Sequence, residues 1–240
     1  MILQADAKSL EWVVGAYLSQ DEVAIEEIWN EVDQHSLNQK AFGLPSRLIA
    51  KKFVFRLMYG GSAYSYANDP DFTDVSRSEK FWQKVIDKFY EKYYGLARWH
   101  TEIVQQVTLT GQLVMPTGRI YKFEKKQKNS FANEEWPVTT IKNYPVQGLG
   151  ADLMSIARVS FRKRFHNEGI NGFLVNTVHD SIVVDCHASE VGRVVRLFDS
   201  VFSDIPRNFE RLFGVEFNLP LRCECGAGPN MKNLEVVVAS

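Results

Sequence analysis

The chain of 240 residues is 45% hydrophobic, which is enough to bury one large core or two modest ones. Its formal net charge of −1 excludes binding of nucleic acid through overall charge, so a nucleic-acid surface would have to be a local basic strip. Because no apolar run approaches the roughly 20 residues of a membrane span and no secretory signal opens the chain, we expect a cytoplasmic protein with no membrane partner.

Short strands and longer helices alternate along the sequence. Residues 1–6 predict a β-strand that leads directly into a helix over residues 9–19. Apolar positions within residues 78–106 fit the buried faces of one or two amphipathic helices, and glycine and proline break residues 108–121 into a predicted β-hairpin. Residues 147–164 return to helix. The fold is therefore predicted to mix α and β structure.

The predicted helix over residues 46–60 carries two cations and two aromatic rings on one face. Arg47, Lys51, Phe55 and Tyr59 are spaced four residues apart, so they lie one above another. Guanidinium and ammonium groups suit phosphate oxygens, and a ring one turn further along can stack on a base or sugar. Such a stripe is more often an ordinary solvated face, but it also suits a nucleoside triphosphate.

A basic run follows the predicted β-hairpin at Arg119–Lys128. It holds Lys122, Lys125 and Lys126 and is the densest candidate for a nucleic-acid surface. A solvated loop explains the same residues equally well.

The strongest β pattern lies near the C-terminal end. Two β-branched runs, residues 173–178 and 182–186, are separated by His179-Asp180-Ser181, which predicts a tight hairpin with a carboxylate at its tip. An aspartate in a turn normally needs no function. Asp6, however, is a second carboxylate at the end of a short strand. Two such carboxylates side by side would form the divalent-metal clamp that two-metal phosphoryl transfer requires.

Three cysteines are present, and their spacing does not predict a metal site. Cys223-Glu-Cys225 is tighter than the usual zinc-knuckle spacing, and Cys186-His187 offers the only other nearby pair of ligands. We therefore expect no metal–thiolate centre.

Taken in order, these segments resemble the polymerase domain of family A DNA polymerases, particularly the short phage replicative type. The first palm motif, the fingers helix and the palm hairpin of that family are matched by Met1–Glu11, Pro45–Gly60 and Val178–Asp180. Supporting stretches lie at Asp33–His35, Thr117–Arg119, Asn143–Gly148 and Leu219–Asn230. The resemblance implies an α+β fold: an antiparallel palm sheet with a catalytic hairpin, and a helical fingers subdomain of a right-hand polymerase, with the thumb absent.

The resemblance also implies a domain organisation and partners. Residues 1–240 would form a partial polymerase domain, with the palm at 1–30 and 143–240 and the fingers at 31–142. Primer-template DNA and dNTPs would be its ligands. Because no thumb, first palm strands or exonuclease has a counterpart, we expect a separate N-terminal chain that carries them and docks on an unpaired palm edge near Met1. For a phage protein the location would be the host cytoplasm.

The catalytic roles follow from the same resemblance. Asp6 and Asp180 would hold two Mg²⁺ ions, for which Mn²⁺ could substitute, and the carbonyl group of Ala7 would be a further metal ligand. Lys51 would be catalytic as well, by protonating the departing pyrophosphate.

The binding roles fall into two groups. Side chains that would contact the incoming nucleotide, through its phosphates, sugar or base, are Arg47, Lys51, His35, Phe55, Tyr59 and the steric-gate residue Glu11. Side chains that would contact DNA are Asn143, Gln147, His179 and Arg119.

Two departures from the family pattern stand out. Ala7-Lys-Ser-Leu10 replaces the usual Tyr-Ser-Gln-Ile, and Ser181 replaces a glutamate that usually follows the hairpin aspartate. Asp185 cannot replace that glutamate, because it lies on the same face but about 13 Å farther along the strand. Weakened or altered metal use is expected.

Two other classes of protein remain open. A non-catalytic DNA-binding or scaffold subunit derived from a polymerase would explain Ser181 and the missing thumb. A metal-dependent nuclease would explain paired carboxylates, but it would not need the triphosphate-binding helix.

Overall fold

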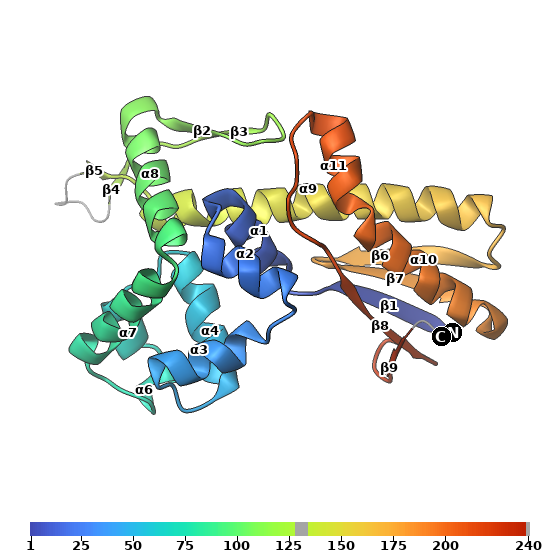
Figure 1. Cartoon of the computed structure of the whole chain (residues 1–240), viewed down its shortest axis with the longest axis horizontal. Helices are drawn as coiled ribbons and strands as arrows, with labels where there is room; N and C mark the ends of the chain where they lie inside the picture. Colours follow the sequence, from blue (N-terminus) through green and yellow to red (C-terminus); the bar gives the residue numbers. More distant parts are fainter. Residues whose placement is uncertain (128–133, 239–240) are drawn as a thin grey trace. The chain divides into compact units, whose positions relative to one another are not determined.

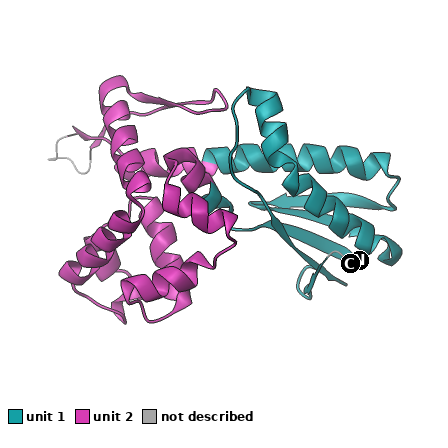
Figure 2. Cartoon of the chain, in the orientation of Figure 1, with its two compact units in different colours: residues 1–13, 148–240 teal, residues 14–147 magenta. Residues whose placement is uncertain are grey.

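The computed structural model describes residues 1–127 and 134–238. The chain forms two compact units (Figure 2). We call residues 1–13 with 148–240 the sheet unit and residues 14–147 the helical unit.

The boundary between the units does not coincide with the predicted subdomain ranges. It falls inside helix α9 (Val138–Asn167), between Gln147 and Gly148. Residues 14–30 and 143–147, expected in the palm, lie in the helical unit. The names palm and fingers describe functions, and they stay predictions.

The sheet unit contains a five-stranded antiparallel sheet in the order β6-β7-β1-β8-β9 (Figure 1). Its strands are β1 (Ile2–Ala7), β6 (Gly172–Val178), β7 (Ser181–Cys186), β8 (Cys223–Gly228) and β9 (Glu235–Val237). The predicted α+β class is confirmed, as are the first strand and the late hairpin. The predicted unpaired edge near Met1 is wrong, because β1 pairs with β7 on one side and with β8 on the other.

Burial alternates along β1 and distinguishes the two faces of the sheet. Leu3 and Ala5 are fully buried, whereas Asp6 is exposed. Helix α10 (Val191–Ser203) packs on β1 and β8. Phe198 of α10 stacks on Phe161 of α9 with 4.2 Å between ring centroids. Asp6 therefore lies on the face of the sheet opposite to Leu3 and Ala5. A short 3₁₀ helix (Ala188–Glu190) and α11 (Ile205–Phe213) complete the elements of this unit.

Helix α9 is longer than the sequence predicts. It begins at Val138, not at Gln147, and continues through Pro145 to Asn167. A proline inside a helix removes one backbone hydrogen bond and usually marks a boundary, but Pro145 is buried here and the helix runs on. No helix among residues 1–127 and 134–238 is long and apolar enough to cross a membrane.

The helical unit is built almost entirely of helices. They are α1 (Leu10–Ser19, which begins in the sheet unit), α2 (Glu22–Trp29), α3 (Gln34–Phe42), α4 (Arg47–Met58), α5 (Ala63–Ala67), α6 (Pro70–Thr73), α7 (Glu79–Lys92) and α8 (Tyr94–Thr110). Two short hairpins follow, formed by β2 (Gln112–Val114) with β3 (Ile120–Lys122) and by β4 (Lys126–Gln127) with β5 (Glu134–Glu135). The first confirms the hairpin predicted within residues 108–121, although α8 extends to Thr110 and ends at Gly111, whose φ is 72°.

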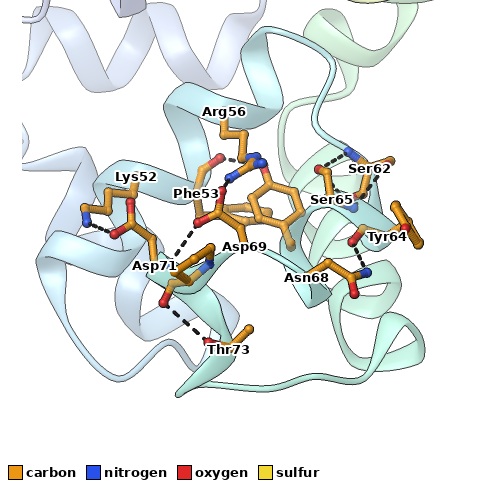
Figure 3. Close-up of polar contacts among 12 residues, drawn as sticks. Lys52, Phe53, Arg56, Ser62, Tyr64, Ser65, Asn68, Asp69, Asp71 and Thr73 are labelled. Atoms are coloured by element: carbon orange, nitrogen blue, oxygen red, sulfur yellow. Dashed lines mark hydrogen bonds and ion pairs between the residues drawn. The ribbon is translucent and has the colours of Figure 1, made fainter.

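Ion pairs along one side of helix α4 attach it to α6 and to Asp69, the N-cap of α6 (Figure 3). Arg56 pairs with Asp69, and the Lys52 Nζ atom lies 2.7 Å from an Asp71 carboxylate oxygen. Lys52 and Arg56 are one turn apart, so both pairs lie on the same side of α4. This side is distinct from the stripe that begins with Arg47, so these two ion pairs do not involve the stripe.

Phe53 anchors the buried side of α4. It is fully buried, its ring centroid lies 5.0 Å from that of Tyr66, and the Tyr66 hydroxyl donates a 2.8 Å hydrogen bond to the Phe53 carbonyl oxygen. We expect Phe53→Ala to lower the free energy of unfolding by about 3–5 kcal/mol, because it leaves a large cavity. Chemical denaturation followed by circular dichroism would measure this. Leu48→Ala, on the same helix at 59% exposure, should change stability by less than about 0.5 kcal/mol, and an equal loss in both variants would contradict the prediction.

Candidate active site

The stripe on α4 is accessible to solvent along its length. Ser46 caps the helix by accepting a 3.2 Å hydrogen bond from the Ile49 backbone N–H. Arg47 and Lys51 are exposed, and Phe55 and Tyr59 are half-buried. The first turn of a helix carries unpaired backbone N–H groups and a partial positive charge, which favour anions. The charges of Arg47 and Lys51 add to this positive potential at the N-terminal end of α4.

Arg47 is not free in this structure, because its Nε atom lies 2.7 Å from an Asp33 carboxylate oxygen. Asp33 is also the N-cap of α3, where it accepts hydrogen bonds from the backbone N–H groups of His35 and Ser36. The hydrogen bond from Arg47 holds the pKa of Asp33 well below its usual range. A phosphate group that binds Arg47 would have to compete with this exposed carboxylate.

His35 lies beside the stripe, where it meets Phe55. The two ring centroids are 5.8 Å apart, and the Lys51 Nζ atom lies 5.8 Å from the Phe55 centroid. The side chain of His35 is buried, and its Nδ1 atom has no hydrogen-bond partner among the described residues. Burial, and then the charges of Arg47 and Lys51, lower the pKa of His35 to about 4. His35 is therefore neutral near pH 7, and one ring nitrogen can donate a hydrogen bond.

The shifted pKa of His35 predicts an acid-sensitive fold. An unfolded histidine has a pKa of about 6.5, so between pH 6.5 and pH 4 the unfolded chain binds a proton that the folded chain does not. The stability gained by keeping His35 neutral is thus complete above about pH 6.5 and is lost as the pH falls toward 4. We expect His35→Gln to make unfolding free energy fall less steeply over this window. His166→Gln, at an exposed position, should leave the slope unchanged. A slope that is identical in all three proteins would contradict the prediction.

The far end of the stripe meets α9. The Gln147 Nε2 atom donates a 2.6 Å hydrogen bond to the Tyr59 hydroxyl, although the two residues are 88 positions apart in the chain. Gly60, with a φ of 85°, approaches the backbone of Thr139. Asn143 is half-buried one turn before Gln147 on the same helix. The structure therefore brings Tyr59 together with one of the two polar residues predicted to contact DNA from this helix.

Arg119 lies in the connection between β2 and β3 and is exposed. Lys122, Lys125 and Lys126 are exposed as well, and the Lys125 Nζ atom lies 5.7 Å from the Trp136 ring. Lys128 lies outside the described residues. The basic run thus remains a candidate nucleic-acid surface, and a solvated loop remains consistent with it.

In the sheet unit, the two predicted metal ligands lie at the end of neighbouring strands. Asp6 on β1 is paired with Ser181 on β7, the residue next to Asp180. The Ala7 backbone N–H donates a 2.9 Å hydrogen bond to the Asp180 carbonyl oxygen, which joins β1 to the hairpin turn. Asp6 is exposed and Asp180 is half-buried. The backbone of Asp6 is thus adjacent to the turn that carries Asp180, and the metal site stays a prediction.

The turn that carries Asp180 is tighter than a three-residue connection. Val178 pairs directly with Ser181, which leaves His179 and Asp180 between the strands. His179 has a φ of 51°, an unusual conformation for a residue other than glycine, and its side chain is exposed. The two-residue turn therefore consists of His179, with its positive φ, and Asp180.

Ser181 is buried, and its hydroxyl group donates a 2.9 Å hydrogen bond to the Val178 carbonyl oxygen. The residue that replaces the family's glutamate thus closes the hairpin internally. Asp185 is exposed on the same strand and is paired with Ile2 at the other end of β1. It cannot supply the missing carboxylate.

Glu224 is a neighbour of Asp6 that the sequence did not indicate. It lies on β8, paired with Asp6 on the side opposite to Ser181, and it is exposed. Directly paired residues of antiparallel strands point to the same face of the sheet, so Asp6 lies between Ser181 and Glu224. Only the pairing of residues more than 200 positions apart could have identified this neighbour.

Glu11, the predicted steric gate, lies in the first turn of α1 and is half-buried. It belongs to the sheet unit, as do Asp6, Ala7, His179 and Asp180. The remaining predicted site residues lie in the helical unit: His35, Arg47, Lys51, Phe55, Tyr59, Arg119, Asn143 and Gln147.

The donor set at Asp6 and Asp180 fits magnesium. Mg²⁺ prefers hard oxygen ligands and is commonly held by one or two carboxylates, with water and substrate phosphates completing its shell. The described residues contain no group of three or more His, Cys, Asp or Glu side chains positioned around a metal. The carboxylates of Asp6, on β1, and of Asp180, in the hairpin turn, would be the protein's share of such a site.

Comparison with known proteins assigns the family. Residues 1–233 match the profile of DNA polymerase family A. DNA polymerase I of Treponema pallidum is 24% identical over 235 residues, which cover 95% of this chain and 22% of that protein. DNA polymerase I of Aquifex aeolicus is 29% identical over 156 residues, which cover 64% of this chain and 25% of that protein. The chain thus spans about a quarter of the length of these relatives.

A solved structure shares the fold. The POL domain of Pol1 from M. smegmatis, in complex with DNA primer-template and dNTP, superposes with a TM-score of 0.77 at 21% sequence identity. The match covers 95% of this chain and 39% of that chain. The profile match over nearly the whole sequence confirms the predicted family: the chain belongs to DNA polymerase family A.

Proposed function

We propose that this chain supplies the palm and fingers of a template-directed DNA polymerase, which adds deoxynucleotides to a primer 3′ end by two-metal phosphoryl transfer. The observation that carries the proposal is the placement of Asp6 beside the hairpin turn of Asp180. Phosphoryl transfer requires a protein to position the reactants and to stabilise the developing charge. In this proposal the two carboxylates and the α4 stripe serve these two purposes.

In this proposal Asp6, Asp180 and the carbonyl group of Ala7 hold two Mg²⁺ ions, or Mn²⁺ in their place. When bound, the ions supply activation of the primer 3′-hydroxyl group and stabilisation of charge on the leaving pyrophosphate. Asp6 is exposed and Asp180 is half-buried. Glu11 would exclude a ribose 2′-hydroxyl group.

The α4 stripe would bind the incoming dNTP. Arg47 would release the Asp33 carboxylate and bind a phosphate oxygen instead. His35 would donate a hydrogen bond from its neutral ring to the nucleotide. Lys51 would contact the phosphates and give its proton to the departing pyrophosphate. Phe55 would lie against the sugar, and Tyr59 would stack beside the nascent base pair.

Four residues would contact the DNA. They are Asn143, Gln147, His179 and Arg119. Gln147 donates a hydrogen bond to the Tyr59 hydroxyl group. Substitution of either residue would therefore remove a contact of the other side chain. Exposed polar and basic side chains of this kind position a duplex through its backbone and do not read its sequence.

The hairpin allows a direct test of the missing glutamate. We expect Ser181→Glu to preserve or raise primer extension, because it restores a third carboxylate beside Asp6. Without metal the same variant should be less stable, since Ser181 is buried and the new charge would face Asp6. Extension assays and thermal unfolding with and without Mg²⁺ would measure both effects. A total loss of extension in a folded protein would show that the metal geometry here differs from the family's.

A non-catalytic DNA-binding subunit is the second candidate function. It is favoured by Ser181, whose hydroxyl group is used within the hairpin and not at the metal site. The separate chain with thumb and exonuclease, the phage source and the cytoplasmic location all stay predictions.

One experiment tests both candidates. Mg²⁺-dependent primer extension would be measured with the purified chain, alone and together with the proteins that copurify with it from its native host. Extension that is lost on chelation of Mg²⁺ supports the polymerase. DNA binding without extension under either condition would favour the non-catalytic subunit.

A further inference from the structure

Strand β8 carries a pair of thiols that the proposed polymerase reaction does not use. Cys223 and Cys225 are two residues apart on one strand, so both side chains point to the same face of the sheet. They are paired with Ala7 and Ala5, which lie on the face away from Asp6. The two sulfur atoms are 4.0 Å apart and are not joined in a disulfide.

This separation fits two ligands of one metal ion. Two thiolates about 2.3 Å from a tetrahedral zinc ion are about 3.8 Å apart. The observed Sγ–Sγ distance of 4.0 Å is close to that value. Although Cys-x-Cys is too tight for a zinc knuckle in a loop, an extended strand spreads the two side chains far enough to hold one ion between them.

The two cysteines differ in burial, because Cys223 is half-buried and Cys225 is buried. Both cysteines line a cavity of about 560 Å³ in the sheet unit, beside α10. The Cys223 Sγ atom also lies 3.8 Å from the Asp199 Oδ1 atom, and Asp199 is exposed at the mouth of the same cavity. The hydrogen bond with Cys225, and then burial, raise the pKa of the Cys223 thiol, so the sulfur keeps its proton until a metal ion displaces it.

We propose that Cys223 and Cys225 form a two-thiol site for a thiophilic divalent cation such as Zn²⁺ or Cd²⁺, separate from the carboxylates of Asp6 and Asp180. Soft sulfur ligands select such ions over Mg²⁺. On binding, each thiol releases its proton to solvent and each sulfur forms one bond to the ion, with no change of oxidation state. Water would complete the coordination, since the described residues contain no group of three or more His, Cys, Asp or Glu side chains placed to hold one metal ion.

Cadmium titration of the full chain under a non-thiol reductant tests the proposal, because thiolate–cadmium bonds give a charge-transfer band in the ultraviolet. We expect a band that saturates at one Cd²⁺ per chain, together with a rise in unfolding temperature. Excess Mg²⁺ should not remove the band. Cys223→Ser should abolish both effects, and Asp199→Asn should weaken binding less.

Cys186→Ser is the matched control, because it also removes one thiol of the sheet unit but leaves the pair intact. It should keep the band. Cys223→Val should abolish the band as well. Because valine fits a β-strand, this variant tests the same thiol even if Cys223→Ser fails to fold. The absence of a band in the unaltered chain, its persistence in a folded Cys223 variant, or its loss in Cys186→Ser would each overturn the proposal. None of these measurements depends on polymerase activity.

Discussion

Asp180→Ala is expected to reduce Mg²⁺-dependent primer extension to background, and Asp6→Ala should do the same. Each variant removes one of the two carboxylates that the structure places on neighbouring strands. With a single carboxylate, the protein can no longer hold both ions that the reaction requires. Folding should be nearly intact or slightly more stable, because removal of one negative charge relieves repulsion between the pair.

Asp185→Ala is the matched control for this prediction. Asp185 is an exposed aspartate on the same strand as Ser181, but it lies at the opposite end of the β1–β7 pairing. Its loss should leave extension close to that of the unaltered chain. Unfolding of the Asp180 or Asp6 variant, seen by circular dichroism, would show a structural role instead, and residual extension by either variant would remove that carboxylate from the metal site.

Local sequence patterns were sufficient for the elements that carry the site. Two β-branched runs around His179 and Asp180 predict the hairpin, and the four-residue spacing from Arg47 to Tyr59 predicts the stripe. Both patterns follow from periodicity within one element, so no distant contact is needed to find them.

Features that depend on distant pairing could not be predicted in this way. Strand β1 lies inside the sheet because Ile2 pairs with residues near both 185 and 228, which nothing near Met1 encodes. Helix α9 begins before Gln147 and continues through the buried Pro145, although a proline locally favours a helix boundary.

The site itself shows the same division. Motif matching finds Arg47 and Ser181, but it does not reveal that Asp33 holds Arg47 or that the Ser181 hydroxyl group bonds to Val178. These contacts change the chemistry: the first makes a carboxylate compete with phosphate, and the second engages the Ser181 hydroxyl group within the hairpin. Both contacts depend on the geometry of the fold and cannot be deduced from residue identity alone.

Lys51→Ala is expected to lower kcat/KM for dNTP by about 10²–10³-fold, the loss typical for removal of one group that stabilises developing charge. Four cations lie on α4, and three of them are engaged by carboxylates, namely Arg47 with Asp33, Lys52 with Asp71 and Arg56 with Asp69. Lys51 has no ion-pair partner among the described residues, so no carboxylate competes with a triphosphate for its charge, although its Nζ atom lies 5.8 Å from the Phe55 ring centroid.

Lys52→Ala provides the comparison, because it removes the same side chain one position along the helix. That variant breaks a solvent-exposed ion pair, which is worth at most about 1 kcal/mol of stability, and should change kcat/KM little. Steady-state extension would separate the two, with kcat falling in Lys51→Ala if the lysine protonates pyrophosphate and KM rising alone if it only binds phosphate. Equal effects in the two variants would mean that α4 contributes general positive charge, and Lys51 would then have no specific role in the reaction.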